Sequence, residues 1–320
     1  MASRVSLVAE GDRFQAVSKS LELLGESPLE RAANAKKIVV KPNFVSTYHP
    51  LSATHVDATR AVLEYILPVA GGEVIIAEGS AHGNTERAFE NHGYRGLCDE
   101  YGLEFRDLNY DEARPFSVFD DKYNKVSIRV ARALLESDFR VSVSPPKTHD
   151  TVGLTLSVKN VAMAAPQKRS GPLTRMLNRF CGTAVRDDKW AVHRGCAATH
   201  LNVYLLATVT LPHLAVLDGH TAMEGNGPIY GEPVDWGVAM ASEDAVALDF
   251  TCARMMGVEP ARVGYLHYCA RAGLGDPDDV EVVGADPAKH SREFALHDTA
   301  DAHFWWDVPE EKLAELGLFA

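Results

Sequence analysis

Polar and charged side chains follow four short apolar runs of this sequence, where buried strands are expected to end. Each group lies beside a glycine or a proline, which favours a turn. Strand ends are often polar simply because they reach solvent, so one such group alone does not indicate a site. The four groups are Lys41 to Asn43 after Ile38–Val40, Glu78 to Ser80 after Val74–Ala77, Lys147 to His149 after Phe139–Val143, and Asp218 and Gly219 after Leu214–Leu217.

Together these four strand ends predict one shared cleft. In an open α/β sheet, ligands bind beyond the carboxyl ends of the strands. Side chains that are distant in the sequence then meet at one edge of the sheet. We expect the following six to line the cleft: Lys41, Glu78, Lys147, Lys159, Asp218 and Glu224.

The richest group is Lys147, Thr148 and His149, followed by Lys159 and Asn160. Two ammonium groups and an imidazole suit a carboxylate or a phosphate, and a threonine hydroxyl adds a hydrogen-bond donor. Clustered lysines lower the pKa of one another and of a nearby histidine, so a neutral imidazole could serve as a general base. The alternative is a salt-bridged lysine pair with a capping histidine.

A glycine-rich segment, Glu224–Gly231, follows the last apolar run. Its spacing fits neither a Walker A loop nor the dinucleotide fingerprint. Gly225 and Gly227 indicate close backbone approach or a positive φ. Glu224 and Asn226 would then project into the cleft as acid/base or orienting groups. A tight structural turn is the alternative at this position.

The elements that must position these groups alternate between strand and helix. Apolar residues recur at helical spacing in Phe14–Leu24 and Val56–Leu67, between the β-rich runs, which include Val5–Val8. Residues 195–217 carry no Asp, Glu, Lys or Arg, but Pro212 predicts a core helix ending near Leu211 and then a buried strand. This alternation predicts an α/β fold with a Rossmann-like, mostly parallel sheet, helices on both faces and a second α/β portion.

We place a weak boundary in the polar, turn-rich stretch 108–125. It divides a Rossmann-like half, residues 1–115, from a second α/β portion, residues 116–320, although one continuous domain remains open. In a later helix we expect Ser242 as the N-cap and Asp244 in the first turn. Asp249 lies on an otherwise apolar stretch of that helix and lacks such an explanation.

Composition limits the partners. The chain has 320 residues with a net charge of −12, which argues against nucleic acid and against an anionic membrane. The first residues show no secretory signal, so we expect a cytoplasmic protein. No C-x-x-C pair occurs among Cys98, Cys181, Cys196, Cys252 and Cys269, so we expect no iron–sulfur cluster. A homo-oligomer is possible.

Several blocks of the sequence resemble the "domain of unknown function 362" family. They are KIVVKPNF with Thr54 and His55, EVIIAEGS, PPKTHDTVGLTLSVKN, LAVLDGHTAMEGNGPIYGEP and ASEDAVALDFTCARMMG. The likeness runs in order from about residue 4 to about residue 257. Pro146 departs from the family pattern, and the cysteine-rich ferredoxin segment of many members is missing. The resemblance favours function over structure for the Lys147 group.

We therefore expect an enzyme that acts on a small anionic metabolite by proton transfer, with isomerase or lyase chemistry. His149 would be the base and Glu224 or Asp218 the acid, with Lys147 also catalytic. A faint likeness of the first block to the nickel-pincer lactate racemases points the same way. Ten further residues would bind the substrate: Lys41, Asn43, Glu78, Thr148, Lys159, Asn160, His193, Gly225, Asn226 and Gly227.

Two alternatives stay open: a redox or metal-binding accessory protein, as the ferredoxin-bearing relatives imply, and a non-catalytic anion-binding module. The cofactor is unknown. A divalent metal is possible, but the histidines and carboxylates near the predicted cleft lack H-x-x-x-H or H-E-x-x-H spacing.

One segment, residues 159–194, opposes the charge of the whole chain. It holds eight Lys or Arg residues and two Asp. Because prolines and glycines break it, we interpret it as a cover that closes over the anion, with Lys168, Arg169 and Arg175 above the ligand. The alternative is a fixed basic patch against the acidic C-terminal tail or a second subunit.

Overall fold

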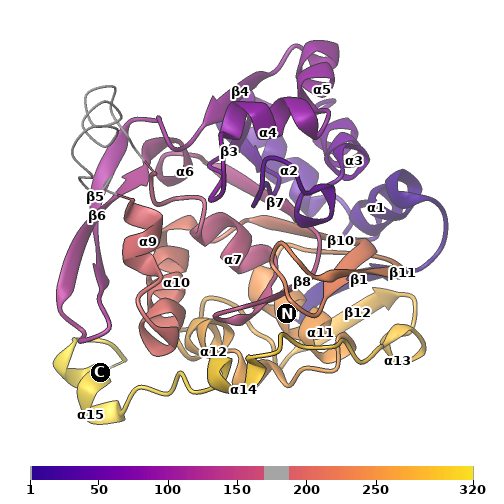
Figure 1. Cartoon of the computed structure of the whole chain (residues 1–320). Helices are drawn as coiled ribbons and strands as arrows, with labels where there is room; N and C mark the ends of the chain where they lie inside the picture. The colour runs from indigo at the N-terminus through magenta and orange to yellow at the C-terminus, as the bar shows by residue number, and fades with distance from the viewer. Residues whose placement is uncertain (1, 169–186, 320) are drawn as a thin grey trace.

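The computed structural model describes residues 2–168 and 187–319 of the chain. Its centre is one sheet in the order β12-β1-β11-β10-β7-β2-β3-β4, with β8 and β9 attached beside β10. All pairings along the main path are parallel except those of β11 with β1 and β10. The mixed α/β class and the mostly parallel sheet expected from the sequence are confirmed (Figure 1).

The strands of the sheet come from the whole length of the chain. They are β1 (Ser3–Val8), β2 (Lys37–Lys41), β3 (Glu73–Glu78), β4 (Glu104–Asp107), β7 (Phe139–Ser144), β8 (Lys147–His149), β9 (Gly153–Thr155), β10 (Leu214–Glu224), β11 (Glu232–Ser242) and β12 (Val280–Gly284). Strand β2 pairs with β3 on one side and with β7 on the other. The expected boundary at residue 115 therefore divides neither the sheet nor its core.

Residue 115 itself lies in a separate two-stranded hairpin. This hairpin consists of β5 (Ala113–Phe119) and β6 (Lys125–Ala131) and extends away from the main sheet (Figure 1). The polar, turn-rich stretch that suggested a boundary includes β5 and the turn between these two strands.

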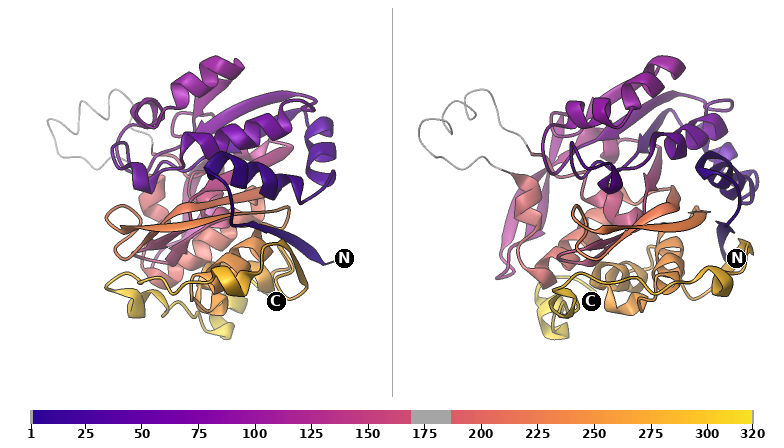
Figure 2. Two further views of the ribbon diagram at one scale, coloured as in Figure 1. Left: turned by 90° about the vertical axis from the view of Figure 1, so that its right-hand side faces the viewer. Right: turned by 45° about the vertical axis from the view of Figure 1, so that its right-hand side comes forward.

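Helices cover both faces of the sheet. Alternate strand residues pack to opposite sides, so Ile38 and Val40 belong to one apolar cluster while Val39 belongs to the other. The first cluster holds α1 (Arg13–Glu22), α2 (Ser27–Asn34), α3 (Val56–Ile66), α4 (Thr85–Asn91) and α5 (Tyr94–Tyr101). Figure 2 shows these N-terminal helices on one side of the β10–β11 pair.

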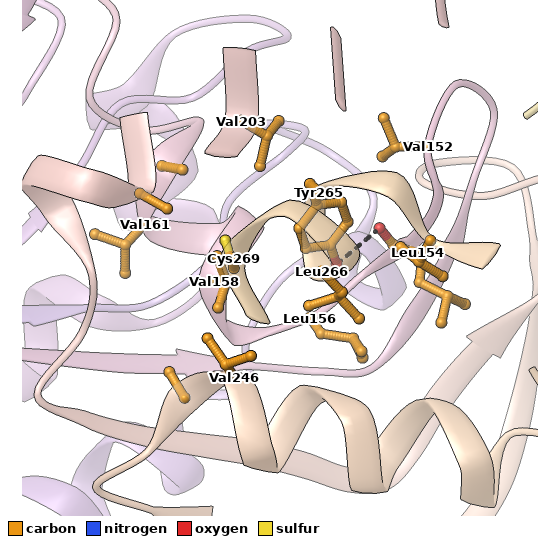
Figure 3. Packing of buried hydrophobic residues seen from close by; sticks show 14 of the residues in the cluster. Val152, Leu154, Leu156, Val158, Val161, Val203, Val246, Tyr265, Leu266 and Cys269 are labelled. Atoms are coloured by element: carbon orange, nitrogen blue, oxygen red, sulfur yellow. Dashed lines mark hydrogen bonds between the residues drawn. The ribbon is translucent and has the colours of Figure 1, made fainter. Parts of the chain in front are cut away.

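The second cluster lies on the opposite face. Its helices are α6 (Arg132–Leu135), α7 (Ser157–Ala162), α9 (Asp188–Val192), α10 (Cys196–Thr210), α11 (Ala245–Met255), α12 (Gly264–Arg271) and α15 (Glu310–Glu315). Short helical turns complete the chain: η1 (Pro50–Ser52), η2 (Pro260–Arg262), α13 (Pro287–His290) and α14 (Ala300–His303). Figure 3 shows part of this cluster, where the Tyr265 hydroxyl donates to the Leu154 carbonyl at 3.4 Å.

Helix α10 and strand β10 lie on either side of Pro212, as the sequence analysis predicts. The helix ends at Thr210, and β10 begins at Leu214. None of the helices in the described part of the chain has both the length and the apolar character needed to span a bilayer.

The expected cap of α11 is wrong by two residues. Asp244 is the N-cap, and its carboxylate accepts from the N–H groups of Val246 and Ala247. Ser242 instead ends β11, and its hydroxyl donates to the Arg4 carbonyl at 2.7 Å. The strand continues to Ser242 because its edge pairs with β1.

Asp249 explains how α7 is held in the core. Its carboxylate accepts from the Ser157 N–H at 2.9 Å, the Ser157 hydroxyl at 2.6 Å and the Val158 N–H at 2.9 Å. Helix α7 thus receives its capping group from α11, because its own N-cap residue, Leu156, makes no side-chain cap. A fully buried Asp on an apolar helix is therefore the tie between two helices.

Replacing Asp249 is expected to destabilise the fold. Asp249→Ala leaves buried donors unpaired and should lower the free energy of unfolding by about 3 kcal/mol, measured by urea denaturation. Asp249→Asn, which keeps one acceptor oxygen, should lower the free energy of unfolding by less than Asp249→Ala does. Asp99→Ala, at an exposed position of α5, is the control and should stay within about 0.5 kcal/mol of the wild type. Equal stability of Asp249→Ala and wild type would contradict this role.

Candidate functional site: a lysine-rich cleft

A cleft of about 510 Å³ opens beyond the carboxyl ends of β2 and β3. Its walls come from β8, α7, α9 and the loops after β2 and β3. Polar lining residues include Lys41, Asn43, Glu78, His149, Lys159, Asn160, Lys189 and His193. Apolar lining residues include Phe44, Val45, Met163, Trp190 and Pro228. Polar groups converging in a partly apolar hollow are typical of a small-molecule site.

One hydrogen-bonded network joins the floor of the cleft. The Lys41 ammonium donates to Glu78 Oε2 at 2.7 Å and to Asn160 Oδ1 at 2.5 Å. Asn43 Nδ2 donates to the same Asn160 oxygen at 2.9 Å. Lys147 Nζ donates to Asn43 Oδ1 and, at 2.8 Å, to the Ser52 carbonyl. The network fixes the ends of β2 and β3 against α7 and β8.

Glu78 is the one buried carboxylate of this network. Its Oε2 also accepts from the Phe44 N–H at 2.7 Å, and its Oε1 accepts from the Gly79 N–H at 2.6 Å. Both oxygens are thus committed to the protein. Glu78 therefore holds the floor together and has little capacity left for a ligand.

Four lysines are buried around this floor: Lys41, Lys147, Lys159 and Lys189. Three of them donate to two acceptors each; for Lys189 these are the carbonyls of Met163, at 2.8 Å, and Ala164, at 3.2 Å. Lys159 differs, because its Nζ has a single long contact, to Thr155 Oγ1 at 3.4 Å, among the described residues. Its amine lines the cleft with donors to spare.

Burial and mutual repulsion lower the pKa of these amines. For Lys147 the fall is caused first by burial and then by Lys159 and Lys41. Burial lowers the pKa of Lys159 to about 7, with Asp150 opposing the shift. Burial also lowers the pKa of Lys189 to about 8. Perturbed amines clustered in a cleft indicate a functional site.

Two further carboxylates line the cleft, those of Asp150 and Asp187. Asp150 is exposed, so water screens its charge. Asp187 caps α9 by accepting from the N–H groups of Lys189 and Trp190. The buried part of the cleft therefore keeps an excess of lysine over carboxylate and favours an anion.

Three histidines line the cleft, His82, His149 and His193, and the two that are buried, His149 and His193, present opposite tautomers. Nδ1 of His149 accepts from the Thr151 N–H at 3.0 Å, with the exposed Asp150 carboxylate 3.1 Å away. Nδ1 of His193 lies 2.9 Å from the Lys189 carbonyl, which can only accept. A neutral His149 thus carries its proton on Nε2, while a neutral His193 has a lone pair there.

Both rings are neutral near pH 7. Burial, followed by the charge of Lys159, lowers the pKa of His149 well below its usual value and lowers that of His193 to about 4. The rings stack at a centroid distance of 6.3 Å. His149 Nε2–H can therefore donate a hydrogen bond, and the lone pair of His193 Nε2 can accept one. In the sequence analysis His149 is the expected base and His193 a substrate-binding residue, and both line the cleft.

The structure brings together most of the expected floor of the site. Lys41, Asn43, Glu78, Lys159 and Asn160 line the cleft, and Lys147 lies directly behind Asn43. Thr148 faces away, and its hydroxyl donates to the Gly225 carbonyl at 2.9 Å.

Asp218 and Glu224, the expected acids, lie outside the cleft. Asp218 shares a strand face with Leu214 and Val216, which pack against the N-terminal helices, and it pairs with Arg13 of α1 at 2.9 Å. Glu224 accepts from the Ala295 N–H at 3.0 Å. Strand alternation thus sends Asp218 to the opposite face from Lys41.

The glycine-rich segment is a structural turn. Gly225 has a positive φ of 71°, and a Cβ on Gly227 would lie 2.2 Å from the Thr148 carbonyl oxygen. Asn226 is exposed and donates to Asp298 at 2.9 Å. Gly225, Asn226 and Glu224 anchor the C-terminal segment, Gly227 packs on Thr148, and Pro228 of the same turn lines the cleft.

The expected cover segment, residues 159–194, is wrong at both ends. Lys159 to Gln167 form α7 and the chain after it, most of which is buried, and Asp188 and Lys189 are buried in α9. Lys168 donates to the Ala81 carbonyl at 2.7 Å. Arg169 and Arg175 lie outside the described residues.

Sequence reasoning missed Lys189 and the apolar wall with Met163 and Trp190. Lys189 follows two acids, as exposed lysines of a helix start often do, and nothing in that pattern indicates burial. Among the described residues, no group of three or more His, Cys, Asp or Glu side chains could hold a metal ion. The described cysteines Cys98, Cys196, Cys252 and Cys269 are free, and Cys181 lies outside the described residues.

Residues 38–254 match the model of a family described as "domain of unknown function (DUF362)". The chain belongs to this family. It is also 26% identical over 281 residues to the thylakoid-associated protein sll1697 of Synechocystis sp., covering 86% of this chain and 76% of that protein. The matched family region contains the whole floor of the cleft.

Among solved structures, the chain resembles the lactate racemase apoprotein from Thermoanaerobacterium thermosaccharolyticum. The TM-score is 0.46 at 13% identity, over 80% of this chain and 57% of that one.

Removing the uncommitted amine is expected to stabilise the fold in a pH-dependent way. Burial disfavours charged Lys159 in the folded state, so its pKa falls from 10.5 to about 7. The free energy of unfolding of Lys159→Met should therefore exceed that of the wild type by about 5 kcal/mol at pH values below 7. This difference in the free energy of unfolding should shrink as pH rises from about 7 to 10.5. In that range Lys159 of the wild type is protonated in the unfolded state but neutral in the folded state.

Urea denaturation at several pH values measures this difference. Lys125→Met, at an exposed position, is the control and should show no pH-dependent difference from the wild type. A Lys159→Met variant that is less stable than wild type at every pH would make Lys159 a structural cation.

Proposed function

We propose that this DUF362 protein is an enzyme that binds a small carboxylate or phosphate metabolite in the cleft and moves a proton at a carbon atom beside the anion. The observation that carries this proposal is the pairing of a neutral proton acceptor, His193 Nε2, with a neutral donor, His149 Nε2, beside the amine of Lys159. Proton transfer at carbon needs these three functions: a base, a donor to the developing enolate oxygen, and a cation for the anionic group.

Each residue then has a distinct role. Lys159, while protonated, binds the anionic group of the substrate. His193 Nε2 takes the proton from carbon, and His149 Nε2–H donates to the oxygen that gains charge. A neutral imidazole can act as such a donor without itself ionising. Lys41, Asn43 and Asn160 keep α7 and the strand ends in register, so that the three groups stay aligned.

The proposal replaces both acids expected from the sequence. Asp218 and Glu224 are engaged with Arg13 and Ala295, away from the cleft. Returning the proton falls to His193, which would give exchange or racemisation at one carbon, or to Lys159, which would give transfer to a second atom. The apolar side of the cleft, with Phe44, Met163 and Trp190, suits the carbon skeleton of the substrate.

The other expectations from the sequence stay predictions. They are a cytoplasmic location, the absence of nucleic-acid and membrane partners, and a possible homo-oligomer. A non-catalytic anion-binding module is the second candidate, because the same lysines would bind an anion without any turnover. The redox or metal-binding alternative gains no support from the described residues.

Hydrogen–deuterium exchange tests the proposal. The protein is incubated in ²H₂O with pyruvate or with L-lactate, and the proton signals at C3 or C2 are followed by NMR. We expect the wild type to accelerate exchange of at least one of these acids. In His193→Gln the rate of exchange should fall by a factor of about 100 or more, because the substitution removes the base. His49→Gln, at an exposed position, should exchange at the wild-type rate.

The outcomes separate the two candidates. Binding of the acid without exchange, measured by calorimetry on the same samples, would favour the non-catalytic module. Exchange that survives His193→Gln would show that the base lies elsewhere.

A further inference from the structure

Three of the four buried lysines are held by the protein, and the fourth is not. Lys41 and Lys147 each donate to two oxygens of the floor, and Lys189 donates to two backbone carbonyls. Lys159 Nζ has only the Thr155 hydroxyl, at 3.4 Å, among the described residues. A structural ammonium ion that is almost fully buried would be expected to have its donors satisfied.

Several hydrogen bonds fix helix α7, which carries Lys159. Asp249 caps its first turn, Asn160 joins it to Lys41, and Ser142 Oγ donates to the Ser157 carbonyl at 3.1 Å. Neighbouring α7 residues Val158 and Val161 are buried in the apolar cluster. The backbone of Lys159 is thus rigid while its amine is free, which is the arrangement that a reactive side chain needs.

Its surroundings also keep the amine in its nucleophilic form. Besides the other lysines, the titratable groups that line the same cleft are Glu78, His82, His149, Asp150, Asp187 and His193. Burial and the neighbouring ammonium of Lys41 both disfavour a charge on Lys159, and its pKa of about 7 leaves much of it neutral in neutral solution. Desolvation beside another cation is the usual way in which a lysine becomes a nucleophile towards carbonyl compounds.

We propose that Lys159 forms a Schiff base with the carbonyl group of an anionic oxo substrate, either a 2-oxo acid or an oxo phosphate. The inference rests on the proposed function and names its substrate class. Protonated Lys159 binds the anionic group in the first complex; once its neutral amine reacts, Lys41 and Lys189, which are fixed in place, would supply the positive field for that group.

The chemistry balances without a further reagent. The amine lone pair attacks the carbonyl carbon, and a C–N bond forms. The carbonyl oxygen takes up the two hydrogens needed to leave as water, one from the amine and one from a proton of the solvent. A protonated imine with one N–H remains. This cationic imine accepts the electron pair when His193 Nε2 removes a proton from the adjacent carbon, which gives an enamine.

Borohydride trapping tests the inference. Protein is incubated with pyruvate, or with dihydroxyacetone phosphate as the phosphate-bearing probe, and then reduced with sodium borohydride. We expect intact-mass spectrometry to show one reduced adduct with at least one probe, and peptide mapping to locate it at Lys159. Lys159→Arg should lose the adduct almost entirely.

Lys125→Arg, at an exposed position outside the cleft, is the matched comparison. It should keep the adduct at Lys159. An adduct located at Lys189, or spread over exposed lysines such as Lys19, would overturn the inference.

The result is distinguishable from a failure of the proposed function. If either probe binds and exchanges its carbon-bound protons in ²H₂O but leaves no adduct on reduction, the Schiff base is wrong and proton transfer stands. If neither probe binds or exchanges and no adduct forms, both the inference and the proposed function fail for this substrate class.

Discussion

The structure depends on one electrostatic constraint: several lysines are buried at the end of a sheet with a single carboxylate, Glu78, among them. An unpaired buried ammonium ion destabilises a fold by several kcal/mol. The protein limits this cost by giving Lys41, Lys147 and Lys189 neutral oxygens from Asn43, Asn160 and backbone carbonyls. The result is a cleft with a positive electrostatic field. Among the buried lysines of the described residues, Lys159 is the one whose amine is not held by two acceptors.

The rest of the fold serves to hold this arrangement. Strands β2 and β3 bring Lys41 and Glu78 together at neighbouring ends, and β7 leads into β8 with Lys147. Helix α7 closes the floor and is too short to be stable alone, so α11 supplies its cap through Asp249. A cleft built from rigid elements keeps its charges in place without a ligand, and this preorganisation favours both binding and catalysis.

Much of the floor could be predicted from the sequence. The apolar runs marked the strands, and the carboxyl ends of parallel strands meet, so Lys41, Glu78 and the Lys147 group were placed near one another. Asp218 follows the same rule along the chain but lies on the other face. Reading the alternation from Leu214 and Val216 would have shown this, because both pack against the N-terminal helices.

Other features had no local signal. The burial of Lys189 and the capping of α7 by Asp249 arise from contacts between segments that are distant in the sequence, and neither residue type favours burial. The donor and acceptor roles of His149 and His193 depend on which backbone group each ring contacts, and residue spacing carries no such information. Glu224 and Asn226 lie in a glycine-rich turn that resembles a binding loop, but the turn holds the C-terminal segment.

The central claim is that the cleft is an anion site with Lys159 as its free amine. A crystal structure with selenate, whose anomalous scattering marks its position, tests this claim most directly. At pH 6, below the pKa of about 7 of Lys159, the account predicts selenate in the cleft within hydrogen-bond distance of Lys159 Nζ and His149 Nε2. Selenate bound only elsewhere on the molecule, with the cleft empty at high occupancy of those other sites, would contradict it.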